Sequence, residues 1–261
     1  MYKKILFDPK VNGPGKKVFK LSRSKIDLFL KCPRCFYLDR RLGVSQPASY
    51  PFTLNSAVDH LLKKEFDIYR QLGRPHPLME KYNIKAKPFL HKDLETWRHN
   101  FTGIQFIFEP ANFLVYGAID DLWVDDNGNL LVVDYKATSK DSEVNLDADW
   151  QVAYKNQMEI YQWLLSKNKF KVSSTGYFVY ANGLRSPSTF DACLKFDMQI
   201  IPYQGDYSWV DKTLLEINKI LINDSLPDGA KDCEYCSYRH QAIEKEQSFK
   251  KEEDKNSVTL F

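Results

Sequence analysis

The sequence predicts an α/β fold in which strands are flanked by helices, and two features indicate it. A strand-forming run at residues 130–133 is apolar at every position, which is typical of a strand buried on both faces. Residues 149–165 then have the length and spacing of an amphipathic helix. With 261 residues and 43% hydrophobic content, the chain can support one substantial core.

The remaining elements are predicted from residues that begin or end helices and from the spacing of apolar residues. Ser22 is expected to cap a helix that stops before Cys32 and Pro33, and a second helix covers about residues 54–71. After residue 243 the chain is almost entirely charged or polar, which is typical of a solvated helix or a disordered linker. We expect strands at 104–109, 113–124, 130–135, 175–180 and 193–201, and a helix at 209–222. These elements suggest an N-terminal extension (1–21), a folded domain (22–243) and a tail (244–261).

Two carboxylates and one lysine gather around a predicted hairpin. Asn127-Gly128 favours the tight turn, Asp120 precedes it, and Asp134 and Lys136 follow the apolar strand. A carboxylate at the end of a buried strand is costly if it is dry, so Asp134 is expected at an opening with a cation partner. Two carboxylates and a lysine can hold a divalent metal and activate water, which is the equipment needed to cut a phosphodiester bond.

These motifs resemble the PD-(D/E)XK nuclease superfamily, and within it the RecB-like branch with the CRISPR adaptation nucleases and AddB-type nuclease domains. The matching segments are Gly117-x-x-Asp120, Asp134-Tyr135-Lys136 and Gln157-x-x-x-Tyr161. The resemblance extends from about Ser22 to Cys236. It implies a restriction-endonuclease-like core, with a mixed central β-sheet flanked by helices.

The resemblance also implies roles for the hairpin residues. Asp120 and Asp134 would be metal ligands, together with the backbone carbonyl of Tyr135. Lys136 would orient the attacking water and stabilise the negative charge that develops on the phosphate. Hard oxygen ligands and a phosphate substrate favour Mg²⁺ or Mn²⁺ as the cofactor.

Two helical segments are expected to complete this site. Gln157 and Tyr161 share one helix face, and the resemblance places Gln157 near the lysine and Tyr161 toward the substrate channel. The family often has a histidine in a helix before the hairpin as an extra metal ligand. At the corresponding position this chain has Asp59, and His60 is the next residue. Adjacent helical residues point about 100° apart, so only one of these two is expected to reach the metal. Asp59 is expected by register, and His60 is the alternative.

Four of the five cysteines form two C-x-x-C pairs, Cys32 with Cys35 and Cys233 with Cys236. The N-terminus lacks the apolar stretch of a secretory signal, so we expect a cytoplasmic protein, in which such pairs more often bind metal than form disulfides. RecB-like nucleases often enclose a [4Fe–4S] cluster between one cysteine early in the chain and three cysteines late in the chain. This chain instead has two early and two late cysteines. Zinc sites also use two such pairs, so Fe–S and Zn²⁺ both stay open, and the resemblance favours Fe–S. Cys193 has no partner and is expected to be a buried small residue.

Charge and the chain end suggest partners. A net charge of +3 and a pI near 8.4 permit nucleic-acid binding. Candidate DNA contacts are Arg34, Arg40, Arg41, Trp97 and Arg98, with solvated surface groups as the alternative reading.

The end of the tail carries a short apolar peptide that includes Val258, Leu260 and Phe261. It resembles the peptide that binds the bacterial sliding clamp, although Ser257 replaces its usual glutamine. Such a peptide docks into a partner's groove, or it folds back on the surface of its own protein.

The sequence therefore predicts a metal-dependent DNA nuclease, most simply an exonuclease on single-stranded or end-containing DNA in replication, repair or defence. One alternative is a CRISPR-adaptation-type exonuclease. Another is a nuclease fold that binds DNA or a clamp without cutting. Intact Asp120, Asp134 and Lys136 argue against this last reading, because decayed members of the family typically lose these residues first.

Overall fold

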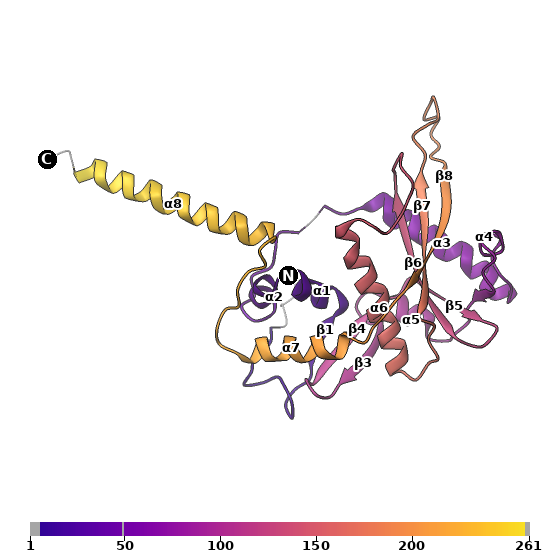
Figure 1. The fold of residues 1–261 in the computed structure, drawn as a ribbon, viewed down its shortest axis with the longest axis horizontal. Coiled ribbons are helices and arrows are strands. Elements are labelled where there is room, and N and C mark those ends of the chain that lie inside the picture. The colour runs from indigo at the N-terminus through magenta and orange to yellow at the C-terminus, as the bar shows by residue number, and fades with distance from the viewer. Residues whose placement is uncertain (1–5, 49, 259–261) are drawn as a thin grey trace.

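The computed structural model describes residues 6–48 and 50–258, with side chains as far as residue 250. Strands and helices form two sheets with helices packed around them, and one long helix extends from the body (Figure 1). In chain order the elements are β1 (Phe19–Ser22), α1 (Arg23–Lys31), α2 (Pro33–Arg40), α3 (Thr53–Leu72), α4 (Pro77–Lys81), β2 (Ala86–Pro88), α5 (Leu94–Arg98), β3 (Ile104–Phe108), β4 (Phe113–Gly117), β5 (Asp121–Asp125), β6 (Leu130–Thr138), the 3₁₀ turn η1 (Asp149–Gln151), α6 (Val152–Lys167), β7 (Thr175–Gly183), β8 (Phe196–Gln204), α7 (Val210–Ile222) and α8 (Glu234–Val258).

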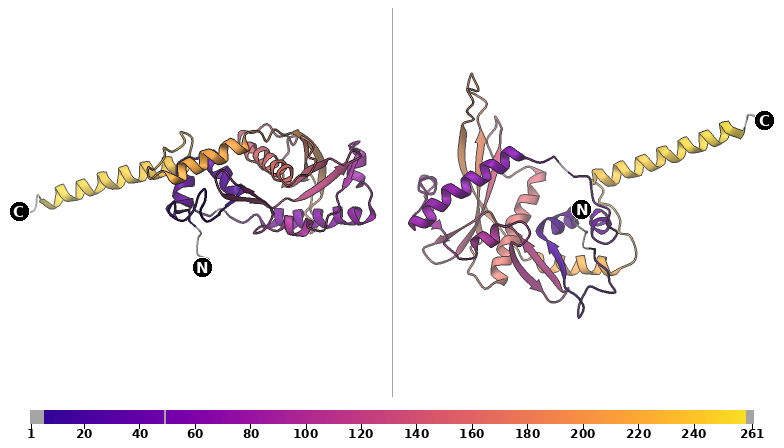
Figure 2. Two further views of the ribbon diagram at one scale, coloured as in Figure 1. Left: turned by 90° about the horizontal axis from the view of Figure 1, so that it is seen from below. Right: turned by 180° about the vertical axis from the view of Figure 1, so that it is seen from behind.

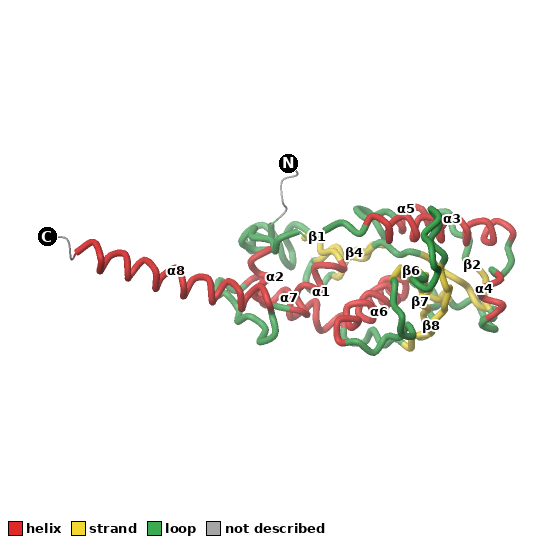
Figure 3. The backbone as a smooth tube through the Cα atoms, turned by 90° about the horizontal axis from the view of Figure 1, so that it is seen from above, coloured by secondary structure: helices red, strands yellow, loops and turns green. Residues whose placement is uncertain are grey.

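The larger sheet is mixed and has the strand order β2-β5-β6-β7-β8. Helices α3 and α6 lie on its opposite faces (Figures 2 and 3). Alternate residues of β6 therefore enter different apolar clusters: Val132 packs in the cluster of α6, and Val133 packs in the cluster of α3. The predicted mixed sheet flanked by helices is confirmed, and β6 is buried on both faces as its apolar run indicated.

The smaller sheet has the order β1-β4-β3, with β1 parallel to β4. Phe19 and Leu21 of β1 are fully buried, and Phe7 packs against Phe19 in the same core. Phe7 and β1 therefore pack in the same core as β4 of the small sheet, although they lie within the predicted N-terminal extension. The predicted division at residue 243 falls inside α8, which begins at Glu234.

The single strand predicted at residues 113–124 is wrong. The chain leaves the small sheet after Gly117 and enters the large sheet at Asp121. Between them, the Ile119 N–H donates to the Trp97 carbonyl at 3.1 Å, and the Asp120 carbonyl accepts from Arg98 Nε at 3.0 Å. These bonds hold the backbone outside either ladder, so Asp120 lies at a crossing between two sheets.

The predicted hairpin exists between β5 and β6, which pair antiparallel with Asp121 opposite Val133. Its turn differs from the expectation, since only Gly128 takes a positive φ, of 77°. The Asp125 carboxylate accepts the N–H groups of Asn127 and Asn129 and closes the turn by its side chain.

Cys193 differs from the sequence expectation, whereas the tail agrees with one of the two alternatives stated for it. Cys193 is exposed rather than buried. The polar tail is helical as far as Val258 and leaves the body at one end (Figure 1). The side chain of Val258 and the whole of Leu260 and Phe261 lie outside the described residues. Of the helices described, none combines the length and the apolar content that a membrane crossing requires.

Candidate active site

Asp134 and Lys136 lie two residues apart on β6 and therefore on the same face of the sheet, the face covered by α6. Asp134 is completely buried and forms an ion pair with Lys136. The Lys136 Nζ also lies 4.3 Å from the centre of the Tyr154 ring on α6. Burial and the neighbouring charge of Asp120 raise the pKa of Asp134 to about 7, although Lys136 opposes that rise.

Asp120 reaches the same place from the crossing between the sheets. Its Oδ2 accepts the backbone N–H of Tyr135 at 3.1 Å. This contact lies just beyond the last pair of β5 with β6, which joins Asp121 and Val133. The N–H and the carbonyl of one strand residue point toward the same edge, so the Tyr135 carbonyl also faces the Asp120 side. Burial would raise the pKa of Asp120, but the charges of Lys63 and Lys136 hold it below its ordinary value.

Helix α3 contributes Asp59 and a lysine that the sequence reading missed. Lys63 Nζ lies 2.8 Å from Asp59 Oδ2 and 3.0 Å from Asp120 Oδ1, so its ammonium bridges the two carboxylates. His60, the alternative ligand, is exposed and does not line the pocket of the site. The spacing of Asp59 and Lys63, four residues apart on one helix face, was a signal that could have revealed this pair.

Helix α6 holds Asp134 from the other side. Gln157 Nε2 donates to Asp134 Oδ1 at 2.7 Å and lies 3.3 Å from the Tyr161 hydroxyl. Gln157 thus contacts the carboxylate that pairs with Lys136, and both side chains line the same pocket. Tyr161 is buried and does not line the pocket, and its ring packs so closely on Gly117 that a Cβ there would come within 2.6 Å.

Asp121, the neighbour of Asp120, is the centre of a buried charge network behind the site. Its Oδ1 forms ion pairs with Arg70 and Arg98, and its Oδ2 accepts the Tyr135 hydroxyl at 2.6 Å. Asp67 pairs with both arginines as well. Because Arg98 also bonds the Asp120 carbonyl, this network fixes the backbone that carries Asp120. No motif in the sequence indicated it.

The site opens into a pocket of about 380 Å³ between α3, β6 and α6. Asp59, Asp120, Lys136 and Gln157 line it, as does Arg23 from α1. A larger pocket of about 740 Å³ lies by β8 and the loop before α6, and none of the predicted site residues lines it. Five of the predicted residues therefore meet at one opening, namely Asp59, Asp120, Tyr135, Lys136 and Gln157. Asp134 is buried beside it and reaches it through its ion pair with Lys136.

The five residues proposed as DNA contacts do not line this pocket. Arg98 is buried and occupied by Asp67 and Asp121, so it serves the interior rather than DNA. Arg41 pairs with Asp224, Arg40 packs over the Phe19 ring, and Trp97 stacks on His91. Arg34 lies beside the loop at Gly229, close to the cysteines.

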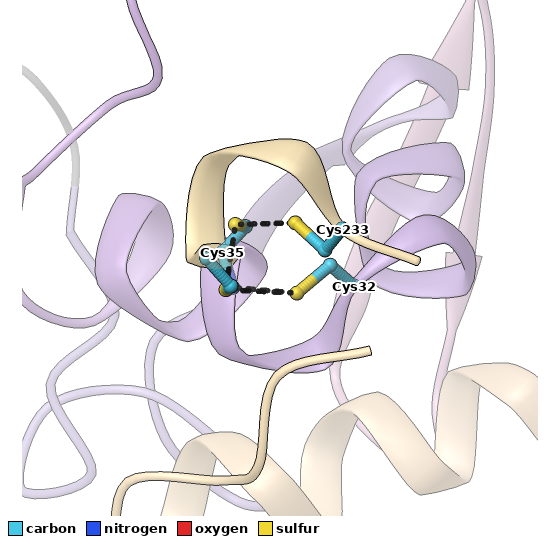
Figure 4. A group of neighbouring side chains, drawn as sticks. Cys32, Cys35 and Cys233 are labelled. Carbon is cyan, nitrogen blue, oxygen red and sulfur yellow. Dashed lines mark hydrogen bonds between the residues drawn. The ribbon is translucent and has the colours of Figure 1, made fainter. Parts of the chain in front are cut away.

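The two cysteine pairs do meet. Their sulfur atoms all lie within 4.8 Å of one another, and three of the four residues are buried (Figure 4). Burial opposes ionisation of Cys32, but the N–H groups of Ala230 and Cys35 outweigh it and lower the pKa of this thiol to about 7. The predicted four-cysteine site that joins the N- and C-terminal segments is confirmed.

Comparison with known proteins agrees with this arrangement. The model of the PD-(D/E)XK nuclease superfamily matches residues 53–241. The chain belongs to this superfamily. The match does not distinguish branches of the family, so the RecB-like assignment of this nuclease stays a prediction. No curated protein matches the chain. A solved structure titled "Crystal structure of SSO0001" is 19% identical over 81% of each chain, but its TM-score of 0.37 is too low to support an argument.

Nucleases of this superfamily generally use divalent metals, and the residues of this one fit such an ion. Asp120 and Asp134 supply hard oxygen ligands beside the edge that carries the Tyr135 carbonyl. Asp134 Oδ2 is buried and forms its ion pair with Lys136, so this oxygen faces the same positive charge that borders the pocket. A divalent ion would relieve the repulsion that raises the Asp134 pKa. Asp59 could join the ligands only after Lys63 moves from between it and Asp120.

Proposed function

We propose that this protein is a Mg²⁺- or Mn²⁺-dependent nuclease that hydrolyses phosphodiester bonds in DNA. The observation that supports it is that Asp120 and Lys136 line one open pocket, with the buried Asp134 paired to Lys136, in a chain of the nuclease superfamily. The β5–β6 hairpin and the residue directly before it supply these three groups, and the charge network of Asp121 fixes the backbone that carries Asp120.

Each residue has a definite part in this proposal. When bound, the metal would lower the pKa of a water and polarise the phosphate. Asp120, Asp134 and the Tyr135 carbonyl would hold it, and Gln157 keeps Asp134 in place through its hydrogen bond. Lys136 carries a positive charge at the mouth of the pocket and stabilises the negative charge that develops on the phosphate.

We propose single-stranded or end-containing DNA as the substrate, because exposed rings flank the pocket. Phe52 lines it and is 72% exposed. Trp150 is 57% exposed and contacts Tyr154, which lies under Lys136, with ring centres 5.3 Å apart. Rings with open faces can stack on unpaired bases, at about 1–3 kcal/mol for each base.

Cleavage of end-labelled single- and double-stranded DNA with Mg²⁺ or Mn²⁺ tests this proposal. We expect Asp134→Ala to lower the rate at least about a thousandfold. Asp126→Ala is the matched control, since Asp126 is an exposed acid in the turn of the same hairpin, and it should leave the rate unchanged.

Two results would redirect the proposal. Equal cleavage by wild type and Asp134→Ala would show that the assignment of the site is wrong. DNA binding without cleavage under either metal would favour the alternative of a non-cleaving module. Cleavage that depends on a free end would support an exonuclease, of which the CRISPR-adaptation type is one kind.

A further inference from the structure

The two cysteine pairs are built alike, each at the start of a helix. Cys32 caps α2, and its Sγ accepts the N–H of Cys35 at 3.5 Å. Cys233 directly precedes α8, and its carbonyl accepts the N–H of Ser237 at 3.0 Å. Each pair therefore presents two sulfur atoms from one helical turn, and the labelled side chains point toward one another (Figure 4).

The distances between pairs are short and nearly equal. Cys35 Sγ lies 3.6 Å from Cys233 Sγ and 3.7 Å from Cys236 Sγ, and Cys32 Sγ lies 3.7 Å from Cys236 Sγ. A disulfide would need a separation of about 2.05 Å, so these contacts are between free cysteines. The four sulfur atoms surround one small central space.

The size of this space distinguishes one ion from a cluster. Four thiolates at about 2.3 Å from a tetrahedral zinc ion lie about 3.8 Å from each other. A [4Fe–4S] cluster attaches each thiolate to a different iron, which separates the four sulfur atoms by about 6 Å. The observed separations, none above 4.8 Å, match the first arrangement and are too short for the second.

The surrounding backbone lies close to the sulfur atoms. The N–H of Ala230 donates to Cys32 Sγ at 3.5 Å, and Gly229 lies so near that a Cβ there would come within 2.9 Å of Cys236 Sγ. Cys32, Cys35 and Cys233 are each at most 5% exposed. An expansion by about 2 Å in each separation would push the sulfur atoms into this loop.

We propose that Cys32, Cys35, Cys233 and Cys236 bind a single tetrahedral Zn²⁺ and not the iron–sulfur cluster that the family resemblance favoured. All four positions around the ion are filled by thiolates, so the site is structural and has no place for a substrate. The inference rests on the sulfur positions alone and does not depend on nuclease activity.

Metal analysis of the purified full chain tests the proposal. Cells are grown with both zinc and iron, and the protein is purified without oxygen. We expect about one zinc and no iron per chain, and no absorption band near about 400 nm. Replacement of the metal by Co²⁺ should give the intense visible spectrum of a tetrahedral thiolate site. Iron in the protein, with or without acid-labile sulfide, would overturn the proposal.

Variants identify the ligands. Cys236→Ser should lower bound zinc well below one per chain, whereas Cys193→Ser, which changes an exposed cysteine outside the site, should keep it. Cys236→His should retain about one zinc, because three cysteines and one histidine are also an ordinary zinc site. This variant covers the case in which Cys236→Ser does not fold. Equal zinc in the Cys236→Ser and Cys193→Ser proteins would overturn the assignment.

Discussion

At the scale of single residues, the two candidate metal ligands Asp134 and Asp120 differ in the direction of their pKa shifts. Asp134 is buried beside Lys136 and has a raised pKa, whereas Asp120 is bonded to Lys63, also lies in the field of Lys136, and has a lowered pKa. Their ionisation at neutral pH therefore differs although both are candidate ligands of the same metal. This difference makes pH and charge the most direct probes of the site.

The raised pKa of Asp134 predicts a pH-dependent loss of stability in the absence of divalent metal. The folded protein keeps this proton up to about pH 7, whereas an ordinary aspartate releases it near 3.8. Between these values the unfolded chain binds fewer protons, so the free energy of unfolding falls as the pH rises. The melting temperature of wild type should fall more from pH 5 to pH 8 than that of Asp134→Asn, by a few degrees.

The measurement is a thermal melt at both pH values in buffer without Mg²⁺ or Mn²⁺. Addition of Mn²⁺ at pH 8 should raise the melting temperature of wild type but not of Asp134→Asn. Parallel pH dependence of the two proteins would contradict the burial argument.

The position of Lys63 predicts a gain of metal affinity on its removal. Its ammonium lies between Asp59 and Asp120, where it competes with a divalent ion for the same oxygens. Lys63→Met should therefore bind Mn²⁺ about tenfold more tightly, as measured by electron paramagnetic resonance of the free ion. Lys64→Met is the matched control, since Lys64 is its exposed neighbour. Unchanged or weaker binding by Lys63→Met would show that this lysine supports the site instead.

At the scale of elements, the close approach of α6 to the end of β4 determines where Gln157 lies. A side chain at Gly117 would overlap the Tyr161 ring, and Tyr161 is one helical turn from Gln157. The glycine of the G-x-x-D motif thus permits a helix contact that places a partner beside Asp134. In this motif the glycine is therefore required for helix packing, whereas the aspartate is the candidate metal ligand.

Gly117→Ala should push Tyr161 and α6 outward, lower the free energy of unfolding by about 1–3 kcal/mol and reduce cleavage. Denaturant titration measures the first effect. The double variant with Tyr161→Leu should lose less stability than the sum of the two single changes, because the smaller side chain removes the overlap. Simple additivity would mean that the overlap is not the cause.

The sequence predicted the parts of the site that one strand or one helix determines. Asp134 and Lys136 share a face because they are two apart on a strand, and Gln157 and Tyr161 because they are four apart on a helix. The contact of Lys63 with Asp120 depends on how α3 packs against the crossing between the two sheets, and local spacing does not reveal this packing.

Tertiary contacts that local spacing does not reveal also explain the error in the expected strand and the interpretation of Arg98. A run that reads as one strand from residue 113 to 124 divides between two sheets, and the tertiary bonds of Arg98 and Trp97 cause the break. Arg98 was interpreted as a surface cation because its partners, Asp67 and the buried Asp121, are distant in sequence.

At the scale of the whole molecule, α8 is a polar helix that projects from the body as far as Val258 (Figure 1). Twenty-five helical residues span about 37 Å. A peptide at its far end could therefore bind a partner without obstructing the DNA site.

We expect deletion of residues 258–261 to abolish retention of the protein on an immobilised bacterial sliding clamp. Ser257→Gln should strengthen it, because glutamine is the usual residue of the clamp-binding peptide at that position. A protein that lacks the four residues and is retained as well as wild type would refute the clamp prediction.

The four-cysteine site also constrains the order of events in biosynthesis. Its two halves are 204 residues apart from Cys32 to Cys236, so the ion closes a loop that contains nearly the entire nuclease core. In a chain-entropy model, closing a loop of this length restricts the unfolded chain by about 5 kcal/mol. A growing chain holds only two of the four thiolates until Cys233 and Cys236 have left the ribosome. Tight zinc binding would therefore mark a chain whose core has been fully synthesised, and prematurely released fragments would lack this stabilisation and be more open to proteolysis.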